Sequence, residues 1–221
     1  MNNSISHIAD NTIASAKNVY TFIKKGNTDD IIKTVLNADK TAHLDTVNFS
    51  KELKGRSTYE TASNIWHFIK QNITYKEDPS GVQLIKSPAK LWKDRQGDCK
   101  SFSVFAGSIL KNLGIPYSYR FTSYRSYDPT PTHVYIIIPA MKGHNEIIID
   151  AVWNEFNTQK KYNHKKDMRT TQIYQVSGIG EVPGRLNIQD PSTLTEGELD
   201  LLIHKQNVEL NEQLQGGRNA K

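Results

Sequence analysis

The sequence predicts an α+β protein in which helices pack against an antiparallel sheet. Three observations carry this prediction. An amphipathic helix with clear start and stop signals covers residues 99–113, and three runs rich in β-branched and aromatic residues follow it. Further helix signals lie before and after this region, so we expect flanking helices at both ends of the 221-residue chain.

Helical patterns open the chain. Apolar residues recur at helical spacing over residues 4–25, and a second, short helix begins at Asn27 or Thr28. Residues 38–56 are polar and predicted to be irregular. We therefore expect residues 1–55 to form a separate helical appendage.

A stronger helix begins at Ser57. Ser57 and Glu60 match a capping box, in which each side chain satisfies a free N–H group of the helix start. Apolar residues then recur at helical spacing: Ala62, Ile65, Trp66, Ile69 and Ile73. Turn residues at 78–81 and a polar turn at 93–97 lead to the next helix.

The helix over residues 99–113 is the best defined. Asp98 is placed to cap its N-terminus, and Gly114 supplies a left-handed residue at its end, before Pro116 prevents continuation. One face is apolar and consists of Cys99, Phe102, Ala106, Ile109 and Leu113.

Three strands are predicted next, at residues 117–125, 133–139 and 146–153. A short turn at 142–145 separates the second from the third. We therefore expect these two to form an antiparallel hairpin.

The rest of the chain carries weaker signals. Residues 154–170 are polar and charged, residues 171–176 suit one more strand, and a capping box at 195–198 begins a C-terminal helix. These signals predict a catalytic core over 56–180 and a C-terminal loop, helix and flexible tail over 181–221.

Composition excludes several classes of protein. Lys and Arg exceed Asp and Glu by 28 to 23, a mild excess that indicates a solvated basic surface and predicts no nucleic-acid partner. One cysteine excludes an intramolecular disulfide. The sequence shows no signal-peptide pattern and no run of about 18 apolar residues. We expect a soluble cytoplasmic protein, or a virion component if a phage encodes it, with no membrane, cofactor or metal.

The cysteine, Cys99, lies in the first turn of the best-defined helix. Free N–H groups and the macrodipole at a helix N-terminus stabilise a thiolate over a thiol, as a nucleophilic cysteine requires. A lone cysteine is also commonly a small buried apolar residue. The position therefore makes Cys99 a candidate nucleophile and leaves a structural role open.

His133 opens the second predicted strand, and Asp150 lies within the third. Because paired strands lie ~5 Å apart, these two side chains can be cross-strand neighbours. The carboxylate would orient the imidazole, which would activate Cys99 and protonate a leaving amine. An acid within an apolar run is also costly unless it is paired. The alternatives are a solvent-facing His133 and an outward-facing Asp150.

These residues resemble the motifs of the transglutaminase-like superfamily. GDCKSF at 97–102 and LGIP at 113–116 are similar to its nucleophile helix, HVYI at 133–136 to its His-bearing strand, and IDA at 149–151 to its Asp-bearing strand. Order and spacing agree, and the resemblance covers roughly residues 57–153.

The resemblance implies a papain/transglutaminase-like core with Cys99, His133 and Asp150 as a catalytic triad. Reactions of the family pass through a thioester, whose acyl group is transferred to water in hydrolysis or to an amine in transamidation. Some members of the family have lost the triad and only bind. The Cys99 N–H is one candidate oxyanion donor. Candidates for the second donor are Gln96, Trp92, Trp66 and Tyr75. The two tryptophans are more often core residues, and Gln96, three residues before Cys99, is too close to it to act as the Gln of papain-like enzymes does.

The sequence therefore predicts a cysteine peptidase, amidohydrolase or acyltransferase with a peptide or protein substrate, and hydrolysis is favoured. Tyr124 and Tyr127 are candidates for lining a substrate groove, or are ordinary loop aromatics. The alternative function is a non-catalytic interaction protein whose flanking helices dock into a larger assembly, such as a phage particle. A third hypothesis has the tail at 215–217 enter the site as a self-processing peptide.

Overall fold

We describe a computed structural model of the chain that covers residues 2–14, 20–24, 28–79 and 82–170. The strand and the helix predicted after residue 170 lie outside these residues. In chain order the elements are α1 (Asn2–Thr12), β1 (Tyr20–Lys24), α2 (Thr28–Thr46), η1 (Ser50–Leu53), α3 (Thr58–Asn72), β2 (Thr74–Tyr75), β3 (Val82–Lys86), α4 (Pro88–Asp94), β4 (Gln96–Gly97), α5 (Cys99–Asn112), β5 (Ser118–Ser123), β6 (His133–Ile138), β7 (Ile147–Ile149) and β8 (His164–Arg169).

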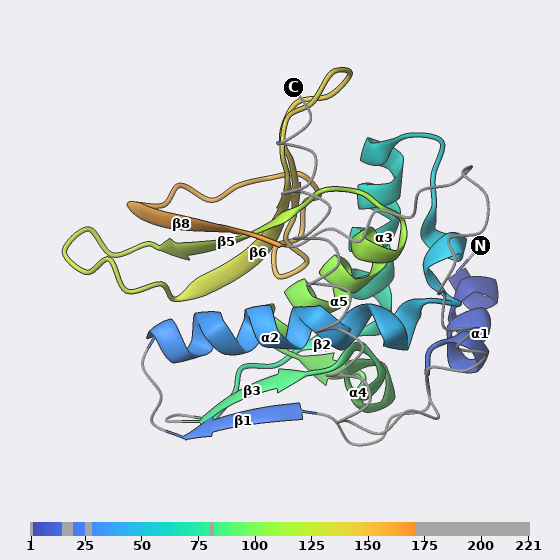
Figure 1. The fold of residues 1–221 in the computed structure, drawn as a ribbon, viewed down its shortest axis with the longest axis horizontal. Coiled ribbons are helices and arrows are strands. Elements are labelled where there is room, and N and C mark those ends of the chain that lie inside the picture. The colour runs from blue at the N-terminus through green and yellow to red at the C-terminus, as the bar shows by residue number, and fades with distance from the viewer. Residues whose placement is uncertain (1, 15–19, 25–27, 80–81, 171–221) are drawn as a thin grey trace, which may run out of the picture. The chain divides into compact units, whose positions relative to one another are not determined.

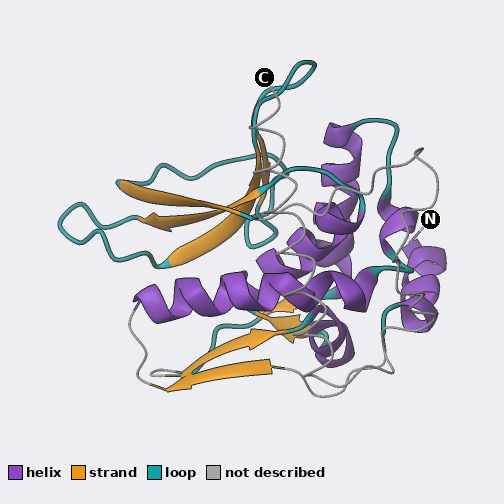
Figure 2. Cartoon of the chain, in the orientation of Figure 1, coloured by secondary structure: helices purple, strands orange, loops and turns teal. Residues whose placement is uncertain are grey.

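A four-stranded antiparallel sheet in the order β7-β6-β5-β8 forms one layer, and α5 packs against it (Figure 1). The predicted hairpin is confirmed, since β6 and β7 pair with Ile137 opposite Ile148. Helices precede the run of consecutive strands β5–β8 that builds this sheet, and the described chain combines helices with antiparallel strands (Figure 2), which confirms the α+β class. None of the helices in the described residues is long and apolar enough to span a membrane.

α5 begins and ends as its sequence predicts. The Asp98 carboxylate accepts a hydrogen bond from the Ser101 N–H at 3.2 Å. At the other end Gly114 adopts a φ of 67°, and the Ile115 N–H donates to the Leu110 carbonyl at 3.0 Å. This left-handed ending turns the chain directly into β5.

The main core lies between α5 and the inner face of the sheet. Side chains alternate along β6, so one set of its residues joins this core and the other set faces away. The inner set comprises Val134, Ile136 and Ile138, which are buried with Phe105 and Ile109 of α5. A smaller buried cluster on the other set contains Tyr135, Ile137 and Ile148.

The prediction of a single N-terminal helix over residues 4–25 is wrong. α1 ends at Thr12, and residues 20–24 form β1, which pairs antiparallel with β3. The spacing of apolar residues suits a helix, but Tyr, Thr, Phe and Ile all favour strands. Pairing with β3, a partner distant in the sequence, decides the outcome.

The irregular segment predicted at 38–56 is also wrong over its first part, because α2 continues to Thr46. Two of its polar residues, Asp39 and Thr46, are buried and make specific contacts. Asp39 is 3% exposed and accepts hydrogen bonds from the Tyr119 hydroxyl at 2.8 Å and the Lys111 ammonium at 3.0 Å. A sequence pattern counts such residues as polar surface and misses the helix.

β8 lies in the segment predicted to carry no element. Its side chains are mostly exposed, as suits an edge strand. Asp167 lies opposite Arg120 of β5 and accepts two hydrogen bonds from its guanidinium, each at 2.8 Å. This ion pair compensates the charge of Arg120, which is only 3% exposed.

The division of the chain into an appendage, a core and a C-terminal segment stays a prediction. α2, from the predicted appendage, packs against α5. Val35, Ala42 and Phe49 belong to the same buried cluster as the core residues Phe105 and Ile109.

Candidate active site

Cys99 is the first residue of α5, and the segment before it fixes its position. Arg95 adopts a left-handed conformation with a φ of 54°, which turns the chain from α4 into β4. Gly97 is packed so closely that a Cβ there would lie 2.4 Å from Leu91 Cδ1. A larger residue at this position would have to displace the buried Leu91 side chain, so the close packing helps to fix the point at which α5 starts.

His133 and Asp150 are brought together by the β6–β7 hairpin. His133 is the first residue of β6, and Asp150 follows directly after β7, one residue beyond the paired strand. His133 Nε2 lies 2.6 Å from Asp150 Oδ2. Because Ile149 pairs with Ile136, Asp150 is diagonal to His133 and not directly opposite it.

The imidazole of His133 is buried between two partners. Burial alone would lower its pKa, but hydrogen bonding to Asp150 and to the Cys99 side chain, with the charges of both, raises the pKa of His133 to about 10. The ring is therefore held as a cation at neutral pH. Since Nε2 contacts Asp150, Nδ1 is the ring nitrogen left for the sulfur.

Helix α3 holds the loop 150–153 that carries the carboxylate. Trp66 Nε1 donates to the Asp150 backbone carbonyl at 2.9 Å, and Lys70 Nζ donates to the Val152 carbonyl at 3.1 Å. Asp150 Oδ1 in turn accepts the Val152 N–H at 3.2 Å. Asp150 is thus fixed through both its backbone and its side chain.

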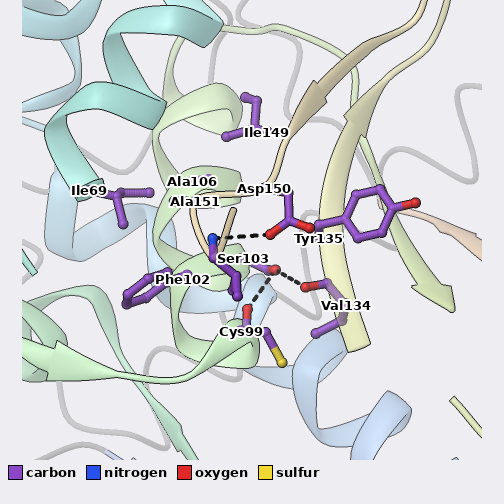
Figure 3. Close-up of a pocket in the computed structure, with 11 residues that line it drawn as sticks. Ile69, Cys99, Phe102, Ser103, Ala106, Val134, Tyr135, Ile149, Asp150 and Ala151 are labelled. Carbon is purple, nitrogen blue, oxygen red and sulfur yellow. Dashed lines mark hydrogen bonds between the residues drawn. The ribbon is translucent and has the colours of Figure 1, made fainter. Parts of the chain in front are cut away.

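Ser103 links the nucleophile helix to the strand that carries the histidine. Its hydroxyl lies 2.7 Å from the Cys99 carbonyl and 3.1 Å from the Val134 carbonyl, as Figure 3 shows. Val134 directly follows His133. Ser103 therefore holds the Cys99 turn at a set position relative to His133, and the sequence gives no local signal for this role.

Two of the predicted oxyanion donors have their indole N–H groups engaged elsewhere. Trp66 donates to the loop 150–153, as described above. Trp92 donates to Asp10 Oδ1 at 3.1 Å, on α1. Gln96 lies in β4 and pairs with Thr74 of β2.

Tyr75 lies on the thiol side of the site. Its ring packs edge-on against Phe102, and burial, followed by the charge of Cys99, raises the pKa of Tyr75. Tyr75 also lines an open hollow of about 260 Å³. Phe102 and Ala151 line both this hollow and the narrow crevice at Cys99 (Figure 3).

Aromatic rings surround His133. The ring centroids of Tyr135, Trp153 and Tyr124 lie 5.5, 6.1 and 6.2 Å from that of the imidazole. Tyr124, a predicted groove residue, is therefore at the site. Tyr127, the other one, is 84% exposed on the loop before β6.

Lys100 is a further charged residue beside Cys99 that the sequence does not single out. It is 6% exposed, and its ammonium bonds to the Asp98 carboxylate and lies 3.1 Å from Asp78 Oδ2. Burial would lower the pKa of Lys100, but Asp98 and then Cys99 and Asp78 raise it. In the described chain, no three His, Cys, Asp or Glu residues are arranged to hold a metal ion.

Comparisons with known proteins agree with this architecture. The family model of the transglutaminase-like superfamily matches residues 47–165, more than half of the chain. Solved structures that resemble it include calcium-bound LapG of Legionella pneumophila, with a TM-score of 0.46, 17% identity, and coverage of 82% of this chain and 99% of that chain.

EGTA-treated LapG gives a TM-score of 0.44 with 18% identity, over 66% of this chain and 81% of that chain. A candidate cysteine protease from Cytophaga hutchinsonii gives a TM-score of 0.37 with 23% identity, and the match covers 60% of this chain and 48% of that chain. No curated protein matches the sequence. The helix on an antiparallel sheet is the fold that the resemblance implies, and the chain belongs to the transglutaminase-like superfamily.

Proposed function

We propose that the chain is a cysteine enzyme that cleaves peptide or amide bonds through a thioester on Cys99. One observation carries this proposal: the imidazole of His133 is held by Asp150 at 2.6 Å and interacts with the Cys99 side chain. Membership of the superfamily supports the same reaction class. A reducing compartment such as the cytoplasm would keep the thiol free.

In the proposed reaction the Cys99 thiolate attacks the carbonyl carbon of the substrate. The C–N bond then breaks, and the His133 imidazolium gives its proton to the leaving amine, which leaves a thioester. Neutral His133 next takes a proton from water as the water attacks the thioester. Release of the carboxylic acid restores the thiolate and the imidazolium.

Two features favour the charged starting state. Cys99 lies in the first turn of α5, where free N–H groups and the helix dipole stabilise an anion. His133 is held as a cation beside it, because Asp150 raises the pKa of the imidazole. The Asp150 carboxylate orients the ring and is not itself a proton carrier.

The oxyanion would be bound on the side of Tyr75. The Cys99 backbone N–H supplies the first donor. Tyr75 is our candidate for the second, because its ring packs against Phe102 and lines the hollow next to the crevice at Cys99. Burial, and then the charge of Cys99, raise the pKa of its hydroxyl, which therefore stays a donor at neutral pH.

We place the acyl part of the substrate in the hollow beside Tyr75. This hollow, about 260 Å³, shares Phe102 and Ala151 with the crevice at Cys99. Residues 70–75 line it together with Phe102 and Ala151. We favour water over an amine as the acceptor of the acyl group.

The proposal is tested by alkylation of the thiol. Iodoacetamide should modify Cys99 rapidly at pH 6, where an ordinary free thiol, with a pKa of about 8.5, is almost fully protonated. His133→Ala should lose most of this low-pH reactivity, and Asp150→Asn should lose part of it. The measurement is the second-order alkylation rate between pH 5 and 10.

A low rate at pH 6 in the unmodified protein, equal to that of His133→Ala, would contradict the proposal. That result would favour the non-catalytic interaction protein that retains the fold. If the thiol is active, the protein is incubated with a peptide mixture, with and without an added amine. New carboxylic acids indicate hydrolysis, and new amides of the added amine indicate transamidation.

A further inference from the structure

A lysine of the chain lies over two aromatic rings beside the imidazole. Lys160 Nζ is 4.9 Å from the ring centroid of Tyr124 and 4.9 Å from that of Trp153. Both rings are neighbours of His133, at 6.2 and 6.1 Å. The next residue toward the N-terminus, Gln159, donates a hydrogen bond to the Tyr135 hydroxyl.

The two rings alone accommodate this ammonium among the described residues, where Lys160 forms no ion pair with a carboxylate. A cation over the face of an aromatic ring is attracted by the negative charge of that face. Lys160 is exposed, whereas Tyr124 and Trp153 are half-buried. The rings are thus a fixed site, and the lysine is a replaceable occupant.

We propose that Tyr124 and Trp153 form a subsite for a cationic side chain of the substrate, a lysine or an arginine, which Lys160 occupies when no substrate is bound. This inference rests on the proposed function, since it places the substrate beside His133. When a substrate cation replaces Lys160, the attraction that Lys160 loses is regained by the incoming cation. The net free energy of this exchange is therefore small, whereas a site emptied of Lys160 offers the incoming cation the full attraction of both rings.

The test compares two reagents that modify Cys99 by the same chemistry. In alkyl methanethiosulfonates the thiolate attacks the thiosulfonate sulfur, a disulfide forms, and methanesulfinate leaves. One reagent carries an ammonium group on a two- to four-carbon chain, and the other is a neutral alkyl of equal length. The ratio of their rates, at pH 7, reports the affinity of the site near the thiol for a cation.

Lys160→Gln should raise this ratio roughly two- to five-fold, the gain expected from an emptied cation–π site. Lys161→Gln is the matched control, because it removes the same charge from the neighbouring exposed residue. The gain in Lys160→Gln should disappear when Tyr124→Leu or Trp153→Leu is added. Thermal unfolding verifies that each variant is folded.

An unchanged ratio in Lys160→Gln would overturn the inference. An equal rise in Lys161→Gln would overturn it as well, because general loss of positive charge would then explain both. The absolute rate with the neutral reagent tests the proposed function separately. A slow neutral reaction with a changed ratio would sink the proposed activation of Cys99 and leave the cation subsite standing.

Discussion

At the scale of single residues, the Ser103 hydroxyl lies between the start of α5, which carries Cys99, and the strand β6, which begins with His133. A serine within a helix commonly bonds to the carbonyl four residues before it, and Ser103 does so with Cys99. Its second neighbour, the Val134 carbonyl at 3.1 Å, belongs to the strand that starts with His133. One buried hydroxyl thereby sets the spacing between thiol and imidazole.

Ser103→Ala should lower the alkylation rate of Cys99 at pH 6 several-fold, because the helix start and β6 lose their direct link. Loss of the hydrogen bond should also cost about 1 kcal/mol of unfolding free energy. The control is Ser108→Ala on the same helix, whose buried hydroxyl donates to the Phe105 carbonyl at 2.7 Å. We expect a similar stability loss there and an unchanged pH profile of alkylation.

The sequence singles out Cys99, His133 and Asp150, which the structure brings together, but not the residues that support them. Cys99 and His133 stand at the starts of elements with strong local signals, and Asp150 interrupts an apolar run. Ser103 and Trp66 act through backbone carbonyls of residues far away in the chain. No local motif encodes such contacts, so they become visible only in the folded structure.

At the scale of elements, α3 supports the carboxylate from outside the sheet. β7 is short and ends before Asp150, so the paired strand alone does not fix the loop. Trp66 and Lys70, one helical turn apart on α3, bond to three consecutive carbonyls of that loop, those of Asp150, Ala151 and Val152. The helix thus replaces the missing strand pairing.

Trp66→Phe should reduce the low-pH alkylation rate of Cys99, because the loop with Asp150 loses a buried hydrogen bond and the imidazole loses a firm partner. Trp92→Phe is the matched control, since its indole bonds to Asp10 and not to the loop. The measurement is the alkylation rate of Cys99 at pH 6 in the two variants. Equal rates would mean that α3 has no part in orienting Asp150.

Element prediction succeeded where signals were local and failed where distant partners decide. α5 has a capping aspartate and a glycine ending, and both are used. β8 is rich in charged residues and is defined by its antiparallel pairing with β5, where Asp167 accepts hydrogen bonds from Arg120. β1 has apolar spacing that also suits a helix, and pairing with β3 settles it.

At the scale of the whole described unit, a buried polar cluster joins α2, α5 and β5. Asp39 accepts hydrogen bonds from the Tyr117 and Tyr119 hydroxyls and from the Lys111 ammonium. Burial and then the charge of Lys111 lower the pKa of nearby His43 from 6.5 to about 4. The cluster ties α2 to α5 and β5 and makes stability depend on pH.

The free energy of unfolding should peak near pH 6.5 and fall on both sides. The pKa of His43 is lowered on folding, so below 6.5 the unfolded chain binds more protons and stability drops by about 3 kcal/mol toward pH 4. The pKa of His133 is raised to about 10, so its contribution is complete below pH 6.5 and is lost as pH rises toward 10.

Urea unfolding at several pH values measures both limbs of this curve. His43→Leu should flatten the acidic limb and leave the alkaline one, and His133→Ala should do the reverse. If the acidic limb has the same slope in His43→Leu and in the unmodified protein, groups other than His43 cause the loss of unfolding free energy at acidic pH.

The position of Lys100 between Asp78 and Asp98 has a consequence for the protein as a whole. The cation that pairs with these two carboxylates is a side chain, bound to the backbone by covalent bonds. Dialysis, dilution or a change of salt cannot wash it out. Each molecule therefore leaves the folding process with a positive charge already in place between these two carboxylates, next to Cys99 in the chain.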